Sequence, residues 1–167
     1  MNWDHYFLRI AKNVAKNSKC FSKQLGAVLV KDKRILSTGY NGPSIEVRRC
    51  NQWAKVDGWP IDNTDNVCPR RKKMGFGSGE GLENCPAAHA ERNTILSAAY
   101  MGICTKDTTL YAYCHLPCKD CIIELINAGI KEIVYLEGPD YDTLSRAILK
   151  DTHITLRPIK EEELNDL

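Results

Sequence analysis

The feature that most constrains this chain is a pair of short motifs, His-Ala-Glu and, further along, Pro-Cys-Lys-Asp-Cys. Imidazole and thiolate are preferred ligands of zinc, and a catalytic zinc site takes three protein ligands and leaves a fourth position open. His89, Cys118 and Cys121 would supply those three ligands, so the fold has to bring the two motifs together. Glu91 would then stand beside the open position and carry protons, without binding the metal.

The spacing of the second motif predicts a helix start. Cys118 and Cys121 are three positions apart, so they share one face of a helix. Pro117 suits a first helical turn, and a helix N-terminus favours thiolate over thiol. Pro86 precedes His89 in a similar way. A lone Cys-x-x-Cys also fits a redox pair or half of a structural zinc knuckle, but the two motifs in this order favour a catalytic site.

Composition indicates an ordinary soluble globular protein, with no general tendency to bind nucleic acid or membrane. The 167 residues predict a single domain over 1–167, with 43% hydrophobic residues, 26% charged residues and a net charge of +2. Its apolar runs are too short to span a bilayer, and its N-terminus lacks a signal pattern. We therefore expect a cytoplasmic protein with no membrane partner, whose eight cysteines serve as metal ligands and thiols.

Hydrophobic periodicity predicts an α/β protein with a three-layer α/β/α arrangement. Its mixed sheet should have about five strands, with helices on both faces. The expected elements are a helix over 3–19, a hairpin over 25–39, helices over 87–101, 117–128 and 140–150, and strands over 108–113, 133–136 and 153–157. Residues 40–84 form an irregular, cysteine-containing insert, and the acidic tail over 160–167 is expected to fray. The candidate ligands stand at helix starts, where open α/β sheets place their ligands.

Longer stretches around these motifs resemble one enzyme family. They are Gly39-Tyr40-Asn41-Gly42-Pro43, Ser78-Gly79-Glu80-Gly81-Leu82, the run from Cys85 to Asn93, the run from Leu116 to Cys121, and Asn127-Ala128-Gly129-Ile130-Lys131. His-x-Glu followed by Pro-Cys-x-x-Cys is the signature of zinc deaminases that act on nucleobases. Over about residues 5–157 the chain resembles the deoxycytidylate (dCMP) deaminase family of the cytidine deaminase superfamily.

The resemblance implies an activity and its regulation. A dCMP deaminase hydrolyses dCMP to dUMP, which supplies thymidylate synthesis. The family implies the cytidine deaminase fold, a catalytic zinc ion and a homo-oligomer that is often a hexamer. It also implies dCTP and dTTP as effectors, with Mg²⁺ accompanying the triphosphate.

The resemblance further implies roles for particular residues. Asn41 would contact the substrate sugar, and the loop that contains it would shape the substrate or effector pocket. The substrate candidates are Lys23, Asn41, Gly42, Ala90, Tyr113 and His115. The effector candidates are Gly39, Tyr40 and Pro43. The basic run Arg70-Arg71-Lys72-Lys73 reads as solvated loop charge or as a phosphate contact. Tyr100 departs from the Arg of some relatives, and Tyr113-Cys114-His115-Leu116 departs from a common Thr-Leu-Ser.

The remaining cysteines allow a second metal site. Cys20, Cys50, Cys68 and Cys85 flank or lie within the insert, and a closed four-thiolate zinc site would brace it. Some dCMP deaminases carry a structural zinc at positions that resemble Cys20 and Cys50. The alternative is four reduced thiols packed as small hydrophobic groups. Cys104 and Cys114 are expected to be thiols of the core.

Two other functional classes remain open. A tRNA adenosine deaminase uses the same zinc motif, but it needs a basic groove for the RNA backbone. The net charge of +2 and the acidic tail make a nucleic-acid partner unlikely on physical grounds. A catalytically inactive zinc scaffold that senses nucleotides is the other class, and the presence of Glu91 argues against it.

Overall fold

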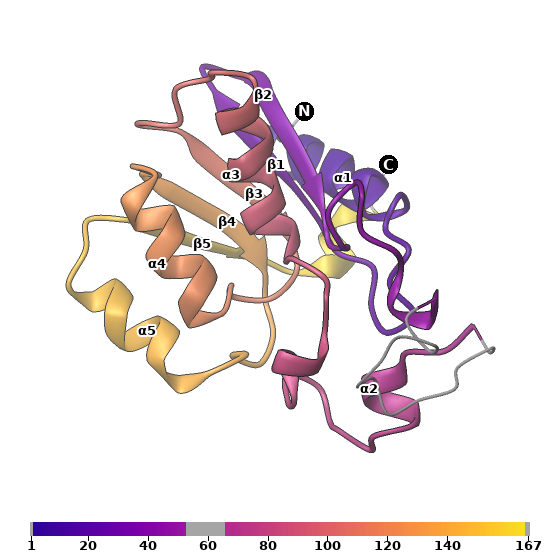
Figure 1. Cartoon of the computed structure of the whole chain (residues 1–167). Helices are drawn as coiled ribbons and strands as arrows, with labels where there is room; N and C mark the ends of the chain where they lie inside the picture. The colour runs from indigo at the N-terminus through magenta and orange to yellow at the C-terminus, as the bar shows by residue number, and fades with distance from the viewer. Residues whose placement is uncertain (1, 53–65, 166–167) are drawn as a thin grey trace.

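The computed structural model describes residues 2–52 and 66–165, which form a mixed five-stranded sheet between two helical layers (Figure 1). The elements are α1 (Trp3–Ala15), β1 (Gly26–Lys31), β2 (Arg34–Tyr40), η1 (Cys50–Gln52), α2 (Pro69–Lys72), η2 (Leu82–Asn84), α3 (Ala90–Tyr100), β3 (Thr109–Tyr113), α4 (Lys119–Asn127), β4 (Glu132–Leu136), α5 (Thr143–Lys150), β5 (Thr155–Ile159) and η3 (Glu161–Leu164). The predicted α/β class and mixed sheet are confirmed.

The strands follow the order β2-β1-β3-β4-β5. β1 pairs antiparallel with β2 and β3, whereas β3, β4 and β5 run parallel to one another. The hairpin between β1 and β2 turns at Asp32 and Lys33, both with positive φ, as a tight two-residue turn requires. Because β3 and β4 are parallel, the segment that leaves β3 crosses one face of the sheet as α4.

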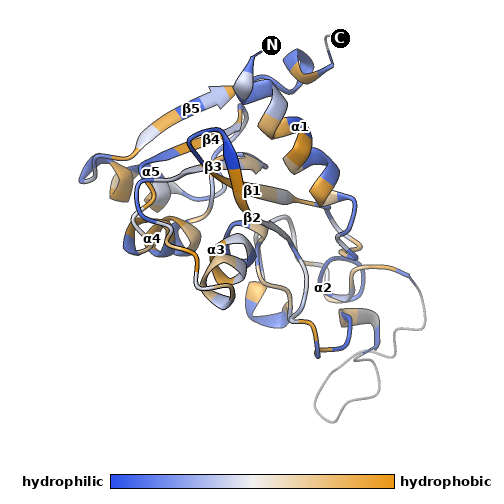
Figure 2. Cartoon of the chain, turned by 90° about the horizontal axis from the view of Figure 1, so that it is seen from above, coloured by the Kyte–Doolittle hydropathy of each residue, from blue (hydrophilic) through white to orange (hydrophobic). Residues whose placement is uncertain are grey.

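Helices cover both faces of the sheet, as Figure 2 shows: α1 lies on one side and α3, α4 and α5 lie on the other. Each side has its own hydrophobic cluster. Phe7 and Leu8 of α1 pack with Val28, while Leu110, Ile122 and other residues form the cluster beneath α3 and α4. The three predicted layers are therefore present, and the two clusters fix the sheet between them.

Two glycines allow helices to approach the hairpin closely. A Cβ at Gly26 would lie 2.3 Å from the carbonyl oxygen of Ala11 in α1. A Cβ at Gly39 would lie 2.4 Å from the backbone nitrogen of Thr94 in α3. Gly39, an effector candidate by sequence, is thus a packing contact between β2 and α3.

α1 ends earlier than its sequence periodicity predicts, at Ala15 rather than near residue 19. The reason is tertiary hydrogen bonding: buried Ser18 donates from Oγ to the carbonyl oxygen of Asn41 at 2.7 Å. Gln24 donates to the carbonyl oxygen of Ser18 at 2.6 Å. These bonds turn the chain away from the helix and fix the segment that leads into β1.

The tail and one thiol differ from expectation. The predicted fraying is wrong for the described tail, because η3 packs beside α1 and buries Leu164. Arg9 of α1 also donates from Nε to the carbonyl oxygen of Leu164 at 2.8 Å. Cys104, predicted as a core thiol, is exposed because it lies in the loop after α3, whereas Cys114 is buried as predicted.

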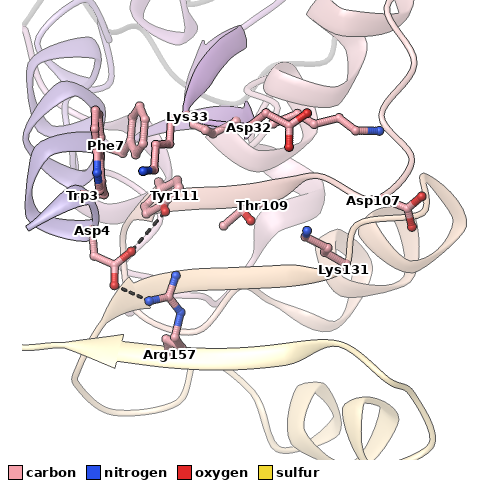
Figure 3. A pocket seen from close by; sticks show the side chains of 12 residues that line it. Trp3, Asp4, Phe7, Asp32, Lys33, Asp107, Thr109, Tyr111, Lys131 and Arg157 are labelled. Atoms are coloured by element: carbon pink, nitrogen blue, oxygen red, sulfur yellow. Dashed lines mark hydrogen bonds and ion pairs between the residues drawn. The ribbon is translucent and has the colours of Figure 1, made fainter.

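A cavity on the α1 side of the sheet is lined by charges that bond one another (Figure 3). Asp4 accepts hydrogen bonds from the Tyr111 hydroxyl at 3.1 Å and from Arg157. Arg157 also donates from Nε to Glu132 at 2.8 Å. Burial, together with Asp4, raises the pKa of Tyr111 to about 12. Arg157, one of the cations that line this cavity, is therefore already neutralised by carboxylates of the chain.

The insert contributes little to the core. Part of it, residues 53–65, lies outside the described residues. Among the described residues between 43 and 89, none belongs to either hydrophobic cluster. Within the described ranges, every helix is too short or too polar to cross a membrane.

Candidate metal and catalytic site

Three potential metal ligands meet where α3 and α4 begin. His89 is the residue that precedes α3, and Cys118 precedes α4. Nδ1 of His89 lies 3.4 Å from Sγ of Cys118 and 3.4 Å from Sγ of Cys121. Tetrahedral zinc with ordinary Zn–N and Zn–S bonds separates such ligand atoms by about 3.5 Å. The donor types and their spacing therefore fit zinc.

A carboxylate from the next helix holds the start of α4. Asp142 accepts the backbone N–H of Lys119 at 2.7 Å and the backbone N–H of Ser145 at 2.8 Å. Ser145 is buried and donates from Oγ to the carbonyl oxygen of Pro117 at 2.9 Å. The start of α5 thus fixes both residues that flank Cys118. Sequence reasoning missed this contact, although an Asp before a helical run is a recognisable N-cap signal.

The three ligand candidates influence one another's protonation. The hydrogen bond from Cys121, helped by His89 and opposed by burial, lowers the pKa of Cys118 to about 4. The same hydrogen bond, together with burial, raises the pKa of Cys121. The contact with Cys118 raises the pKa of His89, against burial. Cys118 is therefore the thiol that ionises first, as a metal ligand must.

Glu91 is buried next to this cluster, with 3% of its surface exposed. Its Oε1 accepts a hydrogen bond from the Cys114 thiol at 3.5 Å. Its Oε2 has no hydrogen-bond partner in the described part of the chain. Burial raises the pKa of Glu91, and the nearby His89 opposes that rise. A carboxyl group with a raised pKa and an unused oxygen is suited to exchanging protons near neutral pH.

Glu91, His89 and Cys118 line a cavity of about 380 Å³. Among the substrate candidates, Lys23, Asn41 and His115 also line it. The side chain of Asn41 is already bonded on both sides. Its Oδ1 accepts from the backbone of Leu25 at 2.8 Å, and its Nδ2 donates to the carbonyl oxygen of Lys23 at 2.8 Å. Asn41 therefore shapes the wall of the cavity by bracing the segment before β1.

The structure does not bring Tyr113 into this cavity. Side chains alternate along a strand, so Tyr113 points to the α1 side while Cys114 faces Glu91. The Tyr113 hydroxyl donates instead to Glu161. Ala90 is fully buried behind the cavity wall, and Gly42 pairs through its backbone with Ala88.

Asp140 and Tyr141, in the loop before α5, line the cavity although they carried no sequence signal for a site. Arg70 of the basic run and Ser78 and Gly79 of the insert line it as well. The Tyr141 ring stands edge-on to His89, with centroids 6.1 Å apart. A Cβ at Gly79 would lie 3.1 Å from the Tyr141 ring. Tyr141 thus connects the metal cluster with the insert, a contact that depends on tertiary structure alone.

The four cysteines around the insert are less closely gathered. Burial raises the pKa of Cys85, and the nearby Cys20 and Cys68 add to that rise. In the described ranges, the His89, Cys118 and Cys121 cluster is the only group of three potential ligands within 4.8 Å. A second zinc site therefore stays a prediction.

Comparison with known proteins adds a family assignment. The sequence model of the "Cytidine and deoxycytidylate deaminase zinc-binding region" matches residues 1–137. The chain is 33% identical to a deoxycytidylate deaminase of Enterobacteria phage T4, an alignment that covers 96% of this chain and 91% of the phage protein. It is 31% identical to the Schizosaccharomyces pombe deoxycytidylate deaminase over 93% of this chain but 44% of the yeast protein. The chain thus spans less than half the length of that relative.

A solved structure shares the fold. The dCMP deaminase of cyanophage S-TIM5 in its apo form superposes with a TM-score of 0.66 at 20% identity, covering 93% of this chain and 96% of the cyanophage chain. The same cyanophage enzyme has been solved in complex with dCMP and dUMP.

Proposed function

Because the chain belongs to the cytidine and deoxycytidylate deaminase family, we propose that it hydrolyses dCMP to dUMP and ammonia. The observation that carries this proposal is Glu91. It is a buried carboxyl group whose Oε2 has no partner in the described part of the chain. It lines the same cavity as His89 and Cys118. A proton carrier beside a metal-ligand cluster is the minimum that hydrolytic deamination requires.

His89, Cys118 and Cys121 would hold the zinc ion. When bound, zinc supplies Lewis acidity that makes hydroxide available near neutral pH. The lowered pKa of Cys118, due first to its hydrogen bond with Cys121, makes a thiolate available for the metal. Asp142 and Ser145 keep the cysteine-bearing turn in place through their bonds to Lys119 and Pro117.

Glu91 moves the protons. Water adds to C4 of cytosine, the C4–N bond breaks, and the amino group leaves as ammonia. Glu91 takes a proton from the attacking water and delivers it to ring N3. It then takes the proton of the new C4 hydroxyl, as the C4 carbonyl forms, and transfers it to the leaving nitrogen. Cys114 occupies Oε1, so Oε2 is the oxygen that can meet water and the base.

The choice of dCMP rests on the relatives. The proteins of phage T4 and of Schizosaccharomyces pombe are named deoxycytidylate deaminases. Lys23, Asn41 and His115 line the proposed substrate cavity. Gly42 and Ala90 do not line it, but Gly42 pairs with Ala88, which does. The product dUMP would supply thymidylate synthesis.

A substrate panel tests the proposal. The purified protein is incubated with dCMP, CMP, dCTP, cytidine and a tRNA pool, and ammonia release is followed. We expect dCMP to give the highest kcat/KM. Deamination of tRNA with no activity on free nucleotides would favour the tRNA-editing alternative. No ammonia release from any of the five substrates would favour a non-catalytic zinc scaffold.

We propose that the chain assembles as a homo-oligomer, with a hexamer as the expected size. Leu96, Tyr100 and Met101 support this, since they form an apolar end of α3 that is exposed, Tyr100 to 90%. Sedimentation at micromolar concentration tests it. A fully active monomer would contradict it.

Regulation by dCTP and dTTP, with Mg²⁺ accompanying the triphosphate, is a further proposal. Tyr40 supports it because its ring is exposed at the end of β2, close to Pro43 in the same loop. The initial rate of dCMP deamination, measured with each triphosphate and Mg²⁺, tests it. Rates that neither nucleotide alters would contradict it.

A second, structural zinc held by Cys20, Cys50, Cys68 and Cys85 completes the proposed cofactors. The closeness of Cys20 and Cys68 to Cys85, whose pKa burial and these two neighbours raise, supports it. We also propose a cytoplasmic location. The eight cysteines are all free of disulfide bonds, which suits a reducing compartment.

A further inference from the structure

Arg70 is a buried cation, although it belongs to a basic run that would ordinarily be solvated. It lies in α2 with 7% of its surface exposed. Its Nη1 donates to the carbonyl oxygen of Gly77 at 3.0 Å and to that of Glu80. Its Nε has no hydrogen-bond partner among the described residues. Nor, within those residues, does Arg70 form an ion pair with a carboxylate.

Such a site is electrostatically incomplete. Backbone carbonyls satisfy N–H donors, but they do not neutralise a charge. A buried guanidinium without a counter-ion costs free energy that an anion would restore. Arginine is also the side chain best matched to phosphate, because its planar fork forms two parallel hydrogen bonds. The contrast with Arg157 is direct, since Asp4 and Glu132 already neutralise that cation.

Arg70 lines the cavity that contains Glu91 and His89. In the described part of the chain, the buried side-chain nitrogen and oxygen atoms without a partner are Arg70 Nε and Glu91 Oε2. Both residues therefore belong to one cavity, and each has an atom whose bonding is incomplete.

The acidic side chains of the cavity do not neutralise Arg70. Asp140, the other acid in the lining, pairs with Arg146, with Oδ1 at 2.8 Å from Nη2. Lys23 also lines the cavity, and it lies close enough to Cys114 to influence that thiol. Tyr141 lies next to Gly79 of the loop that Arg70 braces, and its ring stands edge-on to His89. Arg70 and the metal-ligand cluster thus line one cavity, and Tyr141 is close to both.

We propose that Arg70 binds the 5′-phosphate of the substrate and makes the site selective for a nucleotide over a nucleoside. This inference rests on the proposed deamination of a cytosine nucleotide. With the phosphate at Arg70, the base extends past Tyr141 toward Glu91. Arg70 is then a specificity residue, and proton transfer stays with Glu91.

The test compares dCMP with deoxycytidine, which differ only in the phosphate. In wild type, kcat/KM for dCMP should exceed that for deoxycytidine by at least roughly tenfold, the scale of a charge-assisted hydrogen bond. Arg70→Gln should lower kcat/KM for dCMP by about 10- to 100-fold and change that for deoxycytidine by less than about twofold. Arg70→Lys keeps the positive charge but not the planar guanidinium group. Its kcat/KM for dCMP should lie between those of wild type and Arg70→Gln. The matched control is Lys72→Gln, which removes an exposed charge from the same helix and should leave the substrate ratio unchanged.

Several results would overturn the inference. Equal losses on both substrates in Arg70→Gln would make Arg70 a brace of the insert only. If Arg70→Gln does not fold, Arg70→Lys takes its place. An Arg70→Lys protein that prefers dCMP over deoxycytidine as strongly as wild type would also make Arg70 a brace of the insert only. Wild type that processes both substrates equally well contradicts the inference without any variant. Wild type that is inactive on every cytosine substrate would instead refute the proposed function.

Discussion

The metal-ligand cluster and the insert achieve order in different ways. His89 and Cys118 directly precede helices that pack on the larger hydrophobic cluster, and their ligand atoms lie 3.4 Å apart. The insert's described residues between 43 and 89 belong to neither hydrophobic cluster. Its cysteines approach one another without forming a compact group of three among the described residues. Helices and strands therefore hold the metal-ligand cluster in place, whereas the insert depends on polar contacts such as those of Arg70.

The largest expected effect comes from removing a ligand of the metal-ligand cluster. Replacing His89, Cys118 or Cys121 by Ala should reduce deamination to background and release the bound zinc, because three protein ligands are the minimum for such a site. Activity and elemental analysis are measured on the same samples. Cys104→Ala, which removes an exposed thiol, is the control and should keep both. Persistence of metal and activity in any ligand variant would mean that the assignment is wrong.

A smaller effect is expected at the insert. We predict two zinc ions per chain, one of them held around the insert. Cys20→Ser or Cys50→Ser should remove one equivalent, lower Tm by roughly 4 °C or more, and leave the catalytic metal in place. Elemental analysis and thermal melting check this. One zinc per wild-type chain, with Cys20 and Cys50 both readily alkylated in the native protein, would leave packed thiols as the explanation.

The smallest effect concerns how the metal-ligand cluster is held. Asp142→Ala removes a helix cap and should lower the free energy of unfolding by about 1 kcal/mol at neutral pH. Although partial burial opposes the shift, the backbone N–H groups of Lys119 and Ser145 lower the pKa of Asp142. The stabilisation is thus present above the ordinary Asp value of 3.8 and is lost as the pH falls through the lower folded value.

Urea titrations at neutral and acidic pH measure that difference. Asp151→Ala, at the other end of α5, is the matched control and should show no comparable loss. A difference between wild type and Asp142→Ala that stays constant into strong acid would contradict the proposed role of the carboxylate.

Local patterns were sufficient to predict much of the fold and the candidate ligands. A proline before His89 and before Cys118 predicted helix starts, and short runs of β-forming residues predicted the five strands. Features that depend on distant contacts were not predictable. Leu164 is buried only because η3 returns to α1, and Arg70 is buried only because its loop folds over the cavity.

The direction of individual side chains was also not predictable from the sequence. Tyr113 stands next to Cys114 in sequence, but the alternation of a strand turns it to the opposite face. The resemblance implied that Asn41 contacts the substrate sugar. Asn41 does line the cavity, but its amide is already bonded to Leu25 and Lys23. Closeness to a motif in the sequence therefore indicates which segments lie near the cavity. It does not predict which contacts each side chain makes there.

The most direct test of the central claim is the turnover of Glu91→Gln on dCMP, with zinc measured in the same preparation. Glutamine keeps the size of the side chain and can accept the Cys114 thiol, but it cannot cycle a proton. We predict a fall in kcat of at least about 100-fold, the lower range for a general acid–base group, with zinc content unchanged. Near-normal turnover with zinc retained would contradict the assignment of proton transfer to Glu91.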